Sequence, residues 1–145
     1  MRLLLALDFV DTTERLLAAV VPLAKGTGAT VHLLHVAEPD PSFVGFEAGP
    51  EVVRDQVAHQ IRDERRMLDA HAAALGSDGI EAHVRMVRGP VAKSILSEAA
   101  AVDADIIVMG THGRSALYEA VVGSVSHGVL LGTRVPVLLV PVKKV

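Results

Sequence analysis

The stretch of sequence that decides the fold is Asp105-Ile106-Ile107-Val108-Met109-Gly110-Thr111-His112-Gly113. An apolar run ends at a glycine, and a second glycine follows after two further residues. Short apolar runs rich in β-branched residues are typical of strands that are buried on both faces. Glycine lets the backbone turn sharply and lets a ligand approach it closely. The stretch therefore predicts a buried strand at residues 105–109, followed by a turn suited to ligand contact.

Outward from this strand, short apolar runs alternate with longer segments of helical period. This alternation is typical of successive βα units around a parallel sheet, so the predicted fold class is α/β. Helices are expected from a capping box of Asp11 and Glu14, at residues 51–75, after Gly89-Pro90, and at residues 124–131. The remaining strands are expected at residues 2–8, 30–36, 80–87 and 136–140.

The composition favours a single domain, residues 1–145, with an aliphatic core. Half of the residues are hydrophobic, but the chain has only three Phe, one Tyr and no Trp. The absence of Cys removes disulfides and Cys-based metal sites, and it fits a cytoplasmic location. With 14 Lys and Arg against 17 Asp and Glu, and no basic stripe, we expect no nucleic-acid partner. No apolar stretch is long enough to cross a bilayer, so no membrane partner is expected.

A third glycine of the same region directly precedes a predicted helix. Nine residues separate Gly113 from Gly123, which is followed by Ser124. The first N–H groups of a helix have no partner within the helix, so a helix start can bind an anion such as phosphate. The hydroxyls of Ser124 and Ser126 would add bonds to phosphate oxygens. The alternative is that these glycines serve only turns and a helix cap.

The other end of the expected site follows from strand order. In an open α/β sheet, the ligand crevice lies beyond the carboxyl ends of the strands, where the strand order reverses. If the strand at residues 2–8 neighbours the strand at residues 105–109, Asp8 faces the glycine loop. The sequence alone leaves that neighbourhood open.

Gly110, Gly113, Gly123 and Ser124 together match the pattern Gly, two residues, Gly, nine residues, Gly, Ser. On this motif, and on strand ends such as Ala6-Leu7-Asp8, the chain resembles the ATP-binding members of the universal stress protein family. The resemblance implies a doubly wound sheet of five parallel strands in the order 3-2-1-4-5, with helices on both faces. It also implies an ATP site and a homodimer formed through the strand that Pro136 opens and Val140 ends.

The resemblance also assigns roles to individual residues. One departure is Val10, because family members often have a hydroxyl residue at this position, two after the strand-end Asp. Thr12 or Thr13 is the expected substitute. By resemblance, Asp8 and the backbone around Val36 hold the adenosine end, Met109 and Gly110 line the floor, and Gly113, Gly123, Ser124, Val125 and Ser126 hold the phosphates.

The charge of the phosphates needs a counterpart. No Gly-Lys-Ser or Gly-Lys-Thr loop is present, so no motif places a lysine on the phosphates. Neutralisation therefore falls to the helix start, to Arg114 and to a bound Mg²⁺ or Mn²⁺. For Arg114, a solvated loop position is an equal alternative. His112 has the best claim of the histidines to touch nucleotide, with a solvent-exposed ring as its alternative, and no side-chain motif for a metal is present.

The function favoured by these observations is that of an ATP-binding stress-response or regulatory protein. Nucleotide occupancy would change the dimer or the loop at residues 38–50. The alternatives are an enzyme of the same fold that adenylates a substrate or releases pyrophosphate, and a dimeric scaffold with an empty site. No catalytic residue is assigned, because no partner that orients Asp8 can be recognised, and ATP hydrolysis is expected to be slow at most. Asp103 and Asp105 lie at the opposite end of their strand and are expected as turn and cap residues.

Overall fold

Five parallel strands form one sheet in the computed structural model, in the order β3-β2-β1-β4-β5. The structure describes residues 1–9, 12–37, 50–111 and 122–141. The predicted α/β class, the five strands and their order are confirmed. The strands are β1 (Arg2–Leu7), β2 (Thr30–Ala37), β3 (Ala82–Arg88), β4 (Ile106–Gly110) and β5 (Val137–Val140).

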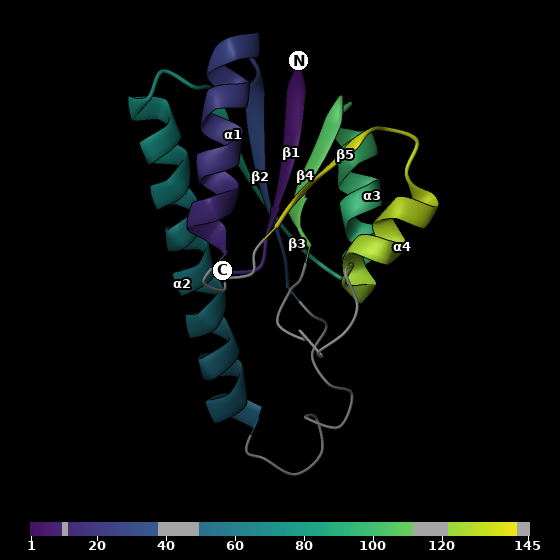
Figure 1. Cartoon of the computed structure of the whole chain (residues 1–145). Helices are drawn as coiled ribbons and strands as arrows, with labels where there is room; N and C mark the ends of the chain where they lie inside the picture. Colours follow the sequence, from purple (N-terminus) through teal and green to yellow (C-terminus); the bar gives the residue numbers. More distant parts are fainter. Residues whose placement is uncertain (10–11, 38–49, 112–121, 142–145) are drawn as a thin grey trace.

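Helices cover both faces of this sheet, as predicted. Helices α1 (Thr13–Thr27) and α2 (Pro50–Ser77) lie on one face, and α3 (Val91–Ala101) and α4 (Ser124–Gly132) lie on the other (Figure 1). Successive side chains of a strand point to opposite faces, so each central strand contributes to two cores. Leu3 and Leu5 pack toward α1 and α2, and Leu4 packs toward α3 and α4, all fully buried. The apolar runs in the sequence are continuous because both faces of these central strands are buried.

The element boundaries agree with the predicted ones to within two residues, and two differences have a physical reason. The N-cap of α1 is Thr12, not Asp11, and its side chain makes no capping hydrogen bond. The Thr12 hydroxyl instead donates to Asp8 Oδ1 at 3.4 Å. Strand β3 begins at Ala82 because Ile80 belongs to the turn after α2, where its N–H donates to the Leu75 carbonyl at 3.0 Å.

The strand order reverses between β1 and β4. From β1 the chain proceeds through β2 to β3 on one side, whereas β4 and β5 are added on the other side. The register pairs Leu3 with Ile106 and Leu5 with Val108, so the carboxyl ends of β1 and β4 lie side by side. In open α/β sheets this is the place where ligands bind. The sequence placed Asp8 near the loop after β4 on the condition that these two strands are neighbours, and β1 and β4 are neighbours.

Helix α4 packs closely on α3 through two glycines one helical turn apart. A Cβ atom on Gly128 would lie 3.0 Å from the Ala92 Cβ, and a Cβ on Gly132 would lie 2.6 Å from Leu96 Cδ1. Small residues at such a crossing allow two helix backbones to approach. The position of α4, and hence of its amino end, depends on this contact.

Candidate functional site

Three hydrogen bonds bring the end of β4 and the start of α4 together. The Gly123 N–H donates to the Thr111 carbonyl at 2.7 Å, and the Ser126 hydroxyl donates to the Gly110 carbonyl at 2.9 Å. The Thr111 N–H donates to the Val140 carbonyl at 3.1 Å, which adds the end of β5. The glycines that bracket the loop in the sequence therefore lie at one place at the carboxyl edge of the sheet.

The amino end of α4 has the geometry of an anion site. Gly123 is its N-cap, with an extended backbone at φ −66° and ψ 163°. The N–H of His127 donates to the Gly123 carbonyl at 2.9 Å, which starts the helical hydrogen-bond ladder. The preceding N–H groups belong to the first turn, where a helix offers donors to an outside acceptor. Ser124 is exposed beside them.

Ser126 differs from Ser124 in its surroundings. Ser126 is only 3% exposed, and its hydroxyl proton is used on the Gly110 carbonyl. This bond ties α4 to the end of β4, a role that the sequence did not indicate. The only sequence signal for this role is the place of the serine, two residues after the start of the helix that follows the β4 loop. The predicted bond from Ser126 to phosphate stays a prediction.

The floor of the candidate site is apolar and lies on the α3 and α4 face. Val36 is 8% exposed and Met109 is 5% exposed, and both pack into the core of that face. Val125 of α4 packs against the same core. The structure therefore brings the ends of β2 and β4 and the first turn of α4 to one face of the sheet.

Asp8 directly follows β1 and is partly exposed. The Thr12 hydroxyl donates to its carboxylate, whereas Thr13 is buried. The Thr12 hydroxyl thus lies beside Asp8, as expected of a substitute for the missing hydroxyl at position 10. Val10, His112, Gly113 and Arg114 lie outside the described residues, so the roles proposed for the last three remain predictions.

A buried polar pair lies behind Asp8 on the opposite face of the sheet. His35 of β2 is 5% exposed, and its Nε2 lies 3.3 Å from Oε2 of Glu64 in α2, which is 6% exposed. From the sequence, neither His35 nor Glu64 was assigned a role in the site. The two residues are 29 positions apart in the sequence. Nothing in the sequence distinguishes Glu64 from the other charged residues of helix 50–77. The sequence signals the pair only through His35 as a polar residue in the mostly apolar run 30–37, a feature that His32 shares.

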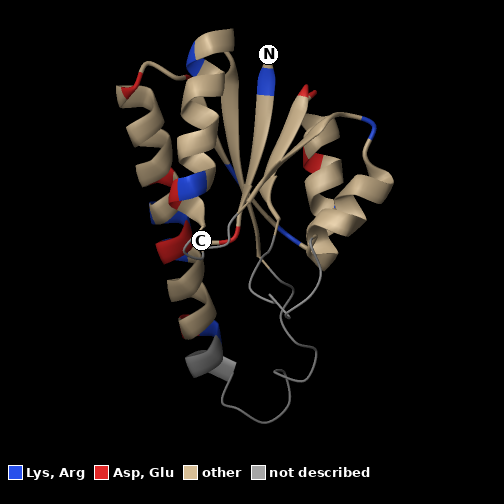
Figure 2. Cartoon of the chain, viewed as in Figure 1, with Lys and Arg blue, Asp and Glu red and all other residues tan. Residues whose placement is uncertain are grey.

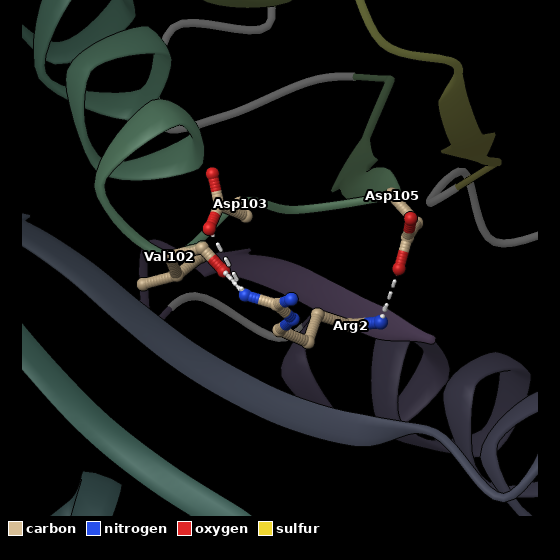
Figure 3. A network of polar contacts seen from close by, with 4 residues as sticks. All are labelled: Arg2, Val102, Asp103 and Asp105. Atoms are coloured by element: carbon tan, nitrogen blue, oxygen red, sulfur yellow. Dashed lines mark hydrogen bonds and ion pairs between the residues drawn. The ribbon is translucent and has the colours of Figure 1, made fainter.

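Asp103 and Asp105 precede β4 and so lie at the opposite edge of the sheet from the candidate site, as predicted, and Figure 3 shows both near Arg2 of β1. Asp105 accepts a hydrogen bond from the Arg2 N–H at 2.7 Å. The Arg2 guanidinium donates from Nη1 to the Val102 carbonyl at 2.9 Å and to Asp103 Oδ2 at 3.3 Å. Asp103 itself has a left-handed backbone, with φ 48°, which is a turn conformation. Both carboxylates therefore stabilise the turn before β4 rather than a ligand site.

Among the described residues, the charged side chains and the possible metal ligands form no second obvious site. Figure 2 shows Lys and Arg interspersed with Asp and Glu along α2, where Arg65 pairs with Asp69 and Arg66 pairs with Asp63. Within the described ranges, no three His, Asp or Glu side chains are grouped so that they could hold a metal ion. No helix in the same part of the chain is long and apolar enough to span a membrane.

Fold and site together define an α/β protein in which a helix begins at the switch point of a 3-2-1-4-5 sheet. A model of the universal stress protein family matches residues 1–141. The chain belongs to the universal stress protein family. None of the curated protein sequences compared with the chain matches it.

Solved structures of similar proteins share this fold over almost the whole chain. The hypothetical protein MJ0577 is 26% identical, with a TM-score of 0.81 over 99% of this chain and 97% of that chain. A member of the family from Burkholderia pseudomallei is 29% identical, with a TM-score of 0.75 over 97% of this chain and 95% of that chain. A universal stress protein from Archaeoglobus fulgidus, solved in complex with dAMP, is 22% identical, with a TM-score of 0.68 over 97% of each chain.

Proposed function

We propose that this chain binds ATP at the carboxyl edge of its sheet and acts as a stress-response or regulatory protein. The observation that carries the proposal is the junction of β4 and α4, where Gly110, Gly123 and Ser124 lie at the switch point beside the end of β1. The family and the Archaeoglobus fulgidus relative solved with dAMP favour an adenine nucleotide as the ligand.

The described residues fit such a ligand. The buried Val36 and Met109 offer an apolar floor of the kind that receives a flat base, and Asp8 offers a carboxylate that can accept hydrogen bonds from ribose hydroxyls. The N–H groups at the start of α4 and the exposed Ser124 hydroxyl are donors suited to phosphate oxygens. These residues would bind and orient the nucleotide, with the adenosine near β1 and β2 and the phosphates at α4.

We further propose that Arg114 and a bound Mg²⁺ or Mn²⁺ neutralise the phosphates, and that His112 and Gly113 complete the loop around them. Of the groups that could neutralise the phosphates, only the start of α4 lies in the described residues. Its partial positive charge is small compared with the negative charge of a triphosphate. Within those residues no side-chain cluster would hold a metal without nucleotide. Any metal would therefore be held chiefly by the phosphates themselves.

We favour a binding protein over an enzyme. The candidate site offers the Asp8 carboxylate, with the Thr12 hydroxyl 3.4 Å away, and no sequence motif places a lysine on the phosphates. Fast hydrolysis needs a group that positions water and cations that stabilise the leaving phosphate. Nucleotide occupancy would then act by changing the preference between conformations or assemblies, in a single domain that works in the cytoplasm as a homodimer.

Calorimetric titration of the purified chain with ATP and AMP, in the presence of Mg²⁺, tests the proposal. The wild-type chain is expected to bind both, with ATP tighter. Ser124→Ala removes one hydroxyl bond to a charged acceptor, worth roughly 1.5–3 kcal/mol. That loss weakens ATP about tenfold to somewhat over a hundredfold, and AMP less. A chain that binds neither nucleotide would overturn the proposed function.

A further inference from the structure

The buried side chains of His35 and Glu64 lie next to each other and make further polar contacts with β1 and α2. The two side chains are each 7% exposed, and Nε2 of His35 lies 3.3 Å from Oε2 of Glu64. The second carboxylate oxygen, Oε1, accepts a hydrogen bond from Gln60 Nε2 at 3.0 Å, one turn earlier on α2. Burial of a histidine and a carboxylate is costly unless both are paired and hydrogen-bonded. This cost suggests that the two side chains do more than fill space in the core.

The other ring nitrogen of His35 points to β1. Nδ1 lies 2.9 Å from the Leu7 carbonyl oxygen. A carbonyl oxygen only accepts, so Nδ1 must carry a hydrogen and donate it to Leu7. An ionised Glu64 carboxylate also only accepts, so its 3.3 Å contact with Nε2 is an ion pair when the ring carries a proton on both nitrogens. The contact with Leu7 therefore places a hydrogen on Nδ1 of His35.

The residue that follows Leu7 is Asp8, and the residue after it has an uncommon backbone. Phe9 has φ 56°, in the left-handed region that bulky residues rarely adopt. Its ring packs against the His35 ring with centroids 4.5 Å apart. His35 thus contacts the residue before Asp8 through a hydrogen bond and the residue after it through its ring face. The carboxylate of Asp8 is held from its outer side by the Thr12 hydroxyl.

We infer that His35 is a positioning residue for the nucleotide site: with Glu64 behind it, it fixes the turn Leu7-Asp8-Phe9 and so the direction of the Asp8 carboxylate. This inference rests on the proposed function, in which Asp8 contacts the adenosine. His35 never touches the ligand, since it lies on the α1 and α2 face of β2, whereas Val36 faces the proposed site. Glu64 acts one step further away, by holding the ring so that Nδ1–H points to Leu7.

The test compares four variants in calorimetric titration with AMP, whose binding depends mainly on the adenosine end. His35→Leu removes both contacts, and His35→Asn keeps an amide donor near the position of Nδ1. Glu64→Gln removes the carboxylate, and His59→Leu removes an exposed histidine of α2 as the control. AMP affinity is expected to fall in His35→Leu by about two- to thirtyfold, the range for residues that affect a site without touching the ligand. His35→Asn should recover most of that loss, and His59→Leu should bind as the wild type does.

Nitrogen NMR of the His35 ring in the wild-type chain supplies a second readout that a packing role would not produce. A hydrogen on Nδ1 is expected, and its signal should change in Glu64→Gln. A ring protonated only on Nε2 would overturn the inference even if His35→Leu fails to fold. Wild-type binding of AMP with equal affinity in folded His35→Leu would overturn the inference and leave the proposed function intact. Absence of AMP binding to the wild-type chain would instead overturn the proposed function, and the inference with it.

Discussion

At the scale of single residues, Gly123 is the most direct test of where the phosphates bind. Its extended backbone, φ −66° and ψ 163°, is open to any residue, so Gly123→Val should fold normally. The added branched side chain would lie beside the first N–H groups of α4, in the space proposed for phosphate oxygens. ATP affinity should collapse, and AMP affinity should fall less. Circular dichroism checks the fold, and unchanged ATP binding would mean that the phosphates bind elsewhere.

His32 makes a prediction for acid stability. Its ring stacks on His83 with centroids 5.3 Å apart, and neither of its nitrogens has a hydrogen-bond partner among the described residues. Burial lowers the pKa of His32, and the neighbouring His83, Arg85 and Arg2 lower it further. Because the folded chain then takes up this proton less readily than the unfolded chain, the stability contribution is complete above the ordinary histidine pKa of about 6.5. It is lost as the pH falls toward the lowered pKa.

Urea denaturation measures this effect in the wild-type chain and in His32→Leu, where no proton can bind at this position. The free energy of unfolding should fall between about pH 8 and about pH 5 in the wild type, and by less in the variant. Equal slopes in the two chains would show that other groups are responsible for the acid sensitivity.

The residues of the candidate site differ in how far the sequence alone could predict them. The spacing of the glycines and serines can be read directly from the sequence, because the turn and the helix start that it predicts are local structures. The bond from Ser126 to Gly110 and the pair of His35 with Glu64 depend on how separate elements pack. A residue type alone does not reveal such contacts, since a buried histidine in an apolar strand fits packing equally well.

At the scale of elements, the crossing of α3 and α4 should be sensitive to added volume. Gly128→Ala would bring a Cβ to 3.0 Å from the Ala92 Cβ, which cannot rotate away. Gly76→Ala on α2 is the matched control, because nothing lies within 4 Å of a Cβ there. Ala gains about 0.5–1 kcal/mol over Gly in a helix interior, so the control should be stabilised. Gly128→Ala should be less stable than the control by about 1–3 kcal/mol, the usual cost of overpacking.

Thermal or urea unfolding of both variants checks this difference. Equal gains at the two positions would mean that α4 can move off α3 at no cost. A loss in Gly128→Ala that is accompanied by weaker ATP binding would further indicate that the crossing sets the position of the α4 amino end.

The edge strand β5 makes a prediction for assembly. It pairs with β4 on one side only, so within the described residues its other edge has open hydrogen-bonding groups. Val137 and Leu139 pack against the core of the α3 and α4 face, whereas Leu138 is 38% exposed. If the proposed homodimer forms through β5, Leu138→Lys should weaken it by placing two like charges near each other. Met67→Lys, at an exposed apolar position on α2, is the control.

Sedimentation over a range of concentrations compares the two variants with the wild-type chain. The wild type and Met67→Lys should sediment as dimers and Leu138→Lys as a monomer at the same concentration. A wild-type chain that remains monomeric at high concentration would remove the basis for the dimer.

At the scale of the whole molecule, the fold could be predicted almost completely from the alternation of apolar runs and helical segments. The apolar runs that form β1, β2 and β4 had to be buried on both faces, and a parallel sheet between two helical layers satisfies that demand. The strand order came from the family resemblance rather than from the pattern, because periodicity does not say which strands are neighbours. The boundaries that differed, at Thr12 and Ile80, depend on single hydrogen bonds, which a hydropathy pattern does not reveal.

The position of β1 at the centre of the sheet also has a consequence during synthesis. Leu3 pairs with Ile106, and the Arg2 N–H donates to Asp105, so one edge of the first strand has partners more than 100 residues further along the chain. At about 5–20 residues per second, a ribosome needs about 5–20 s to make that stretch. Until β4 has emerged, the nascent chain can form only the β3-β2-β1 part of the sheet, and the opposite edge of β1 stays open in the crowded space near the exit tunnel.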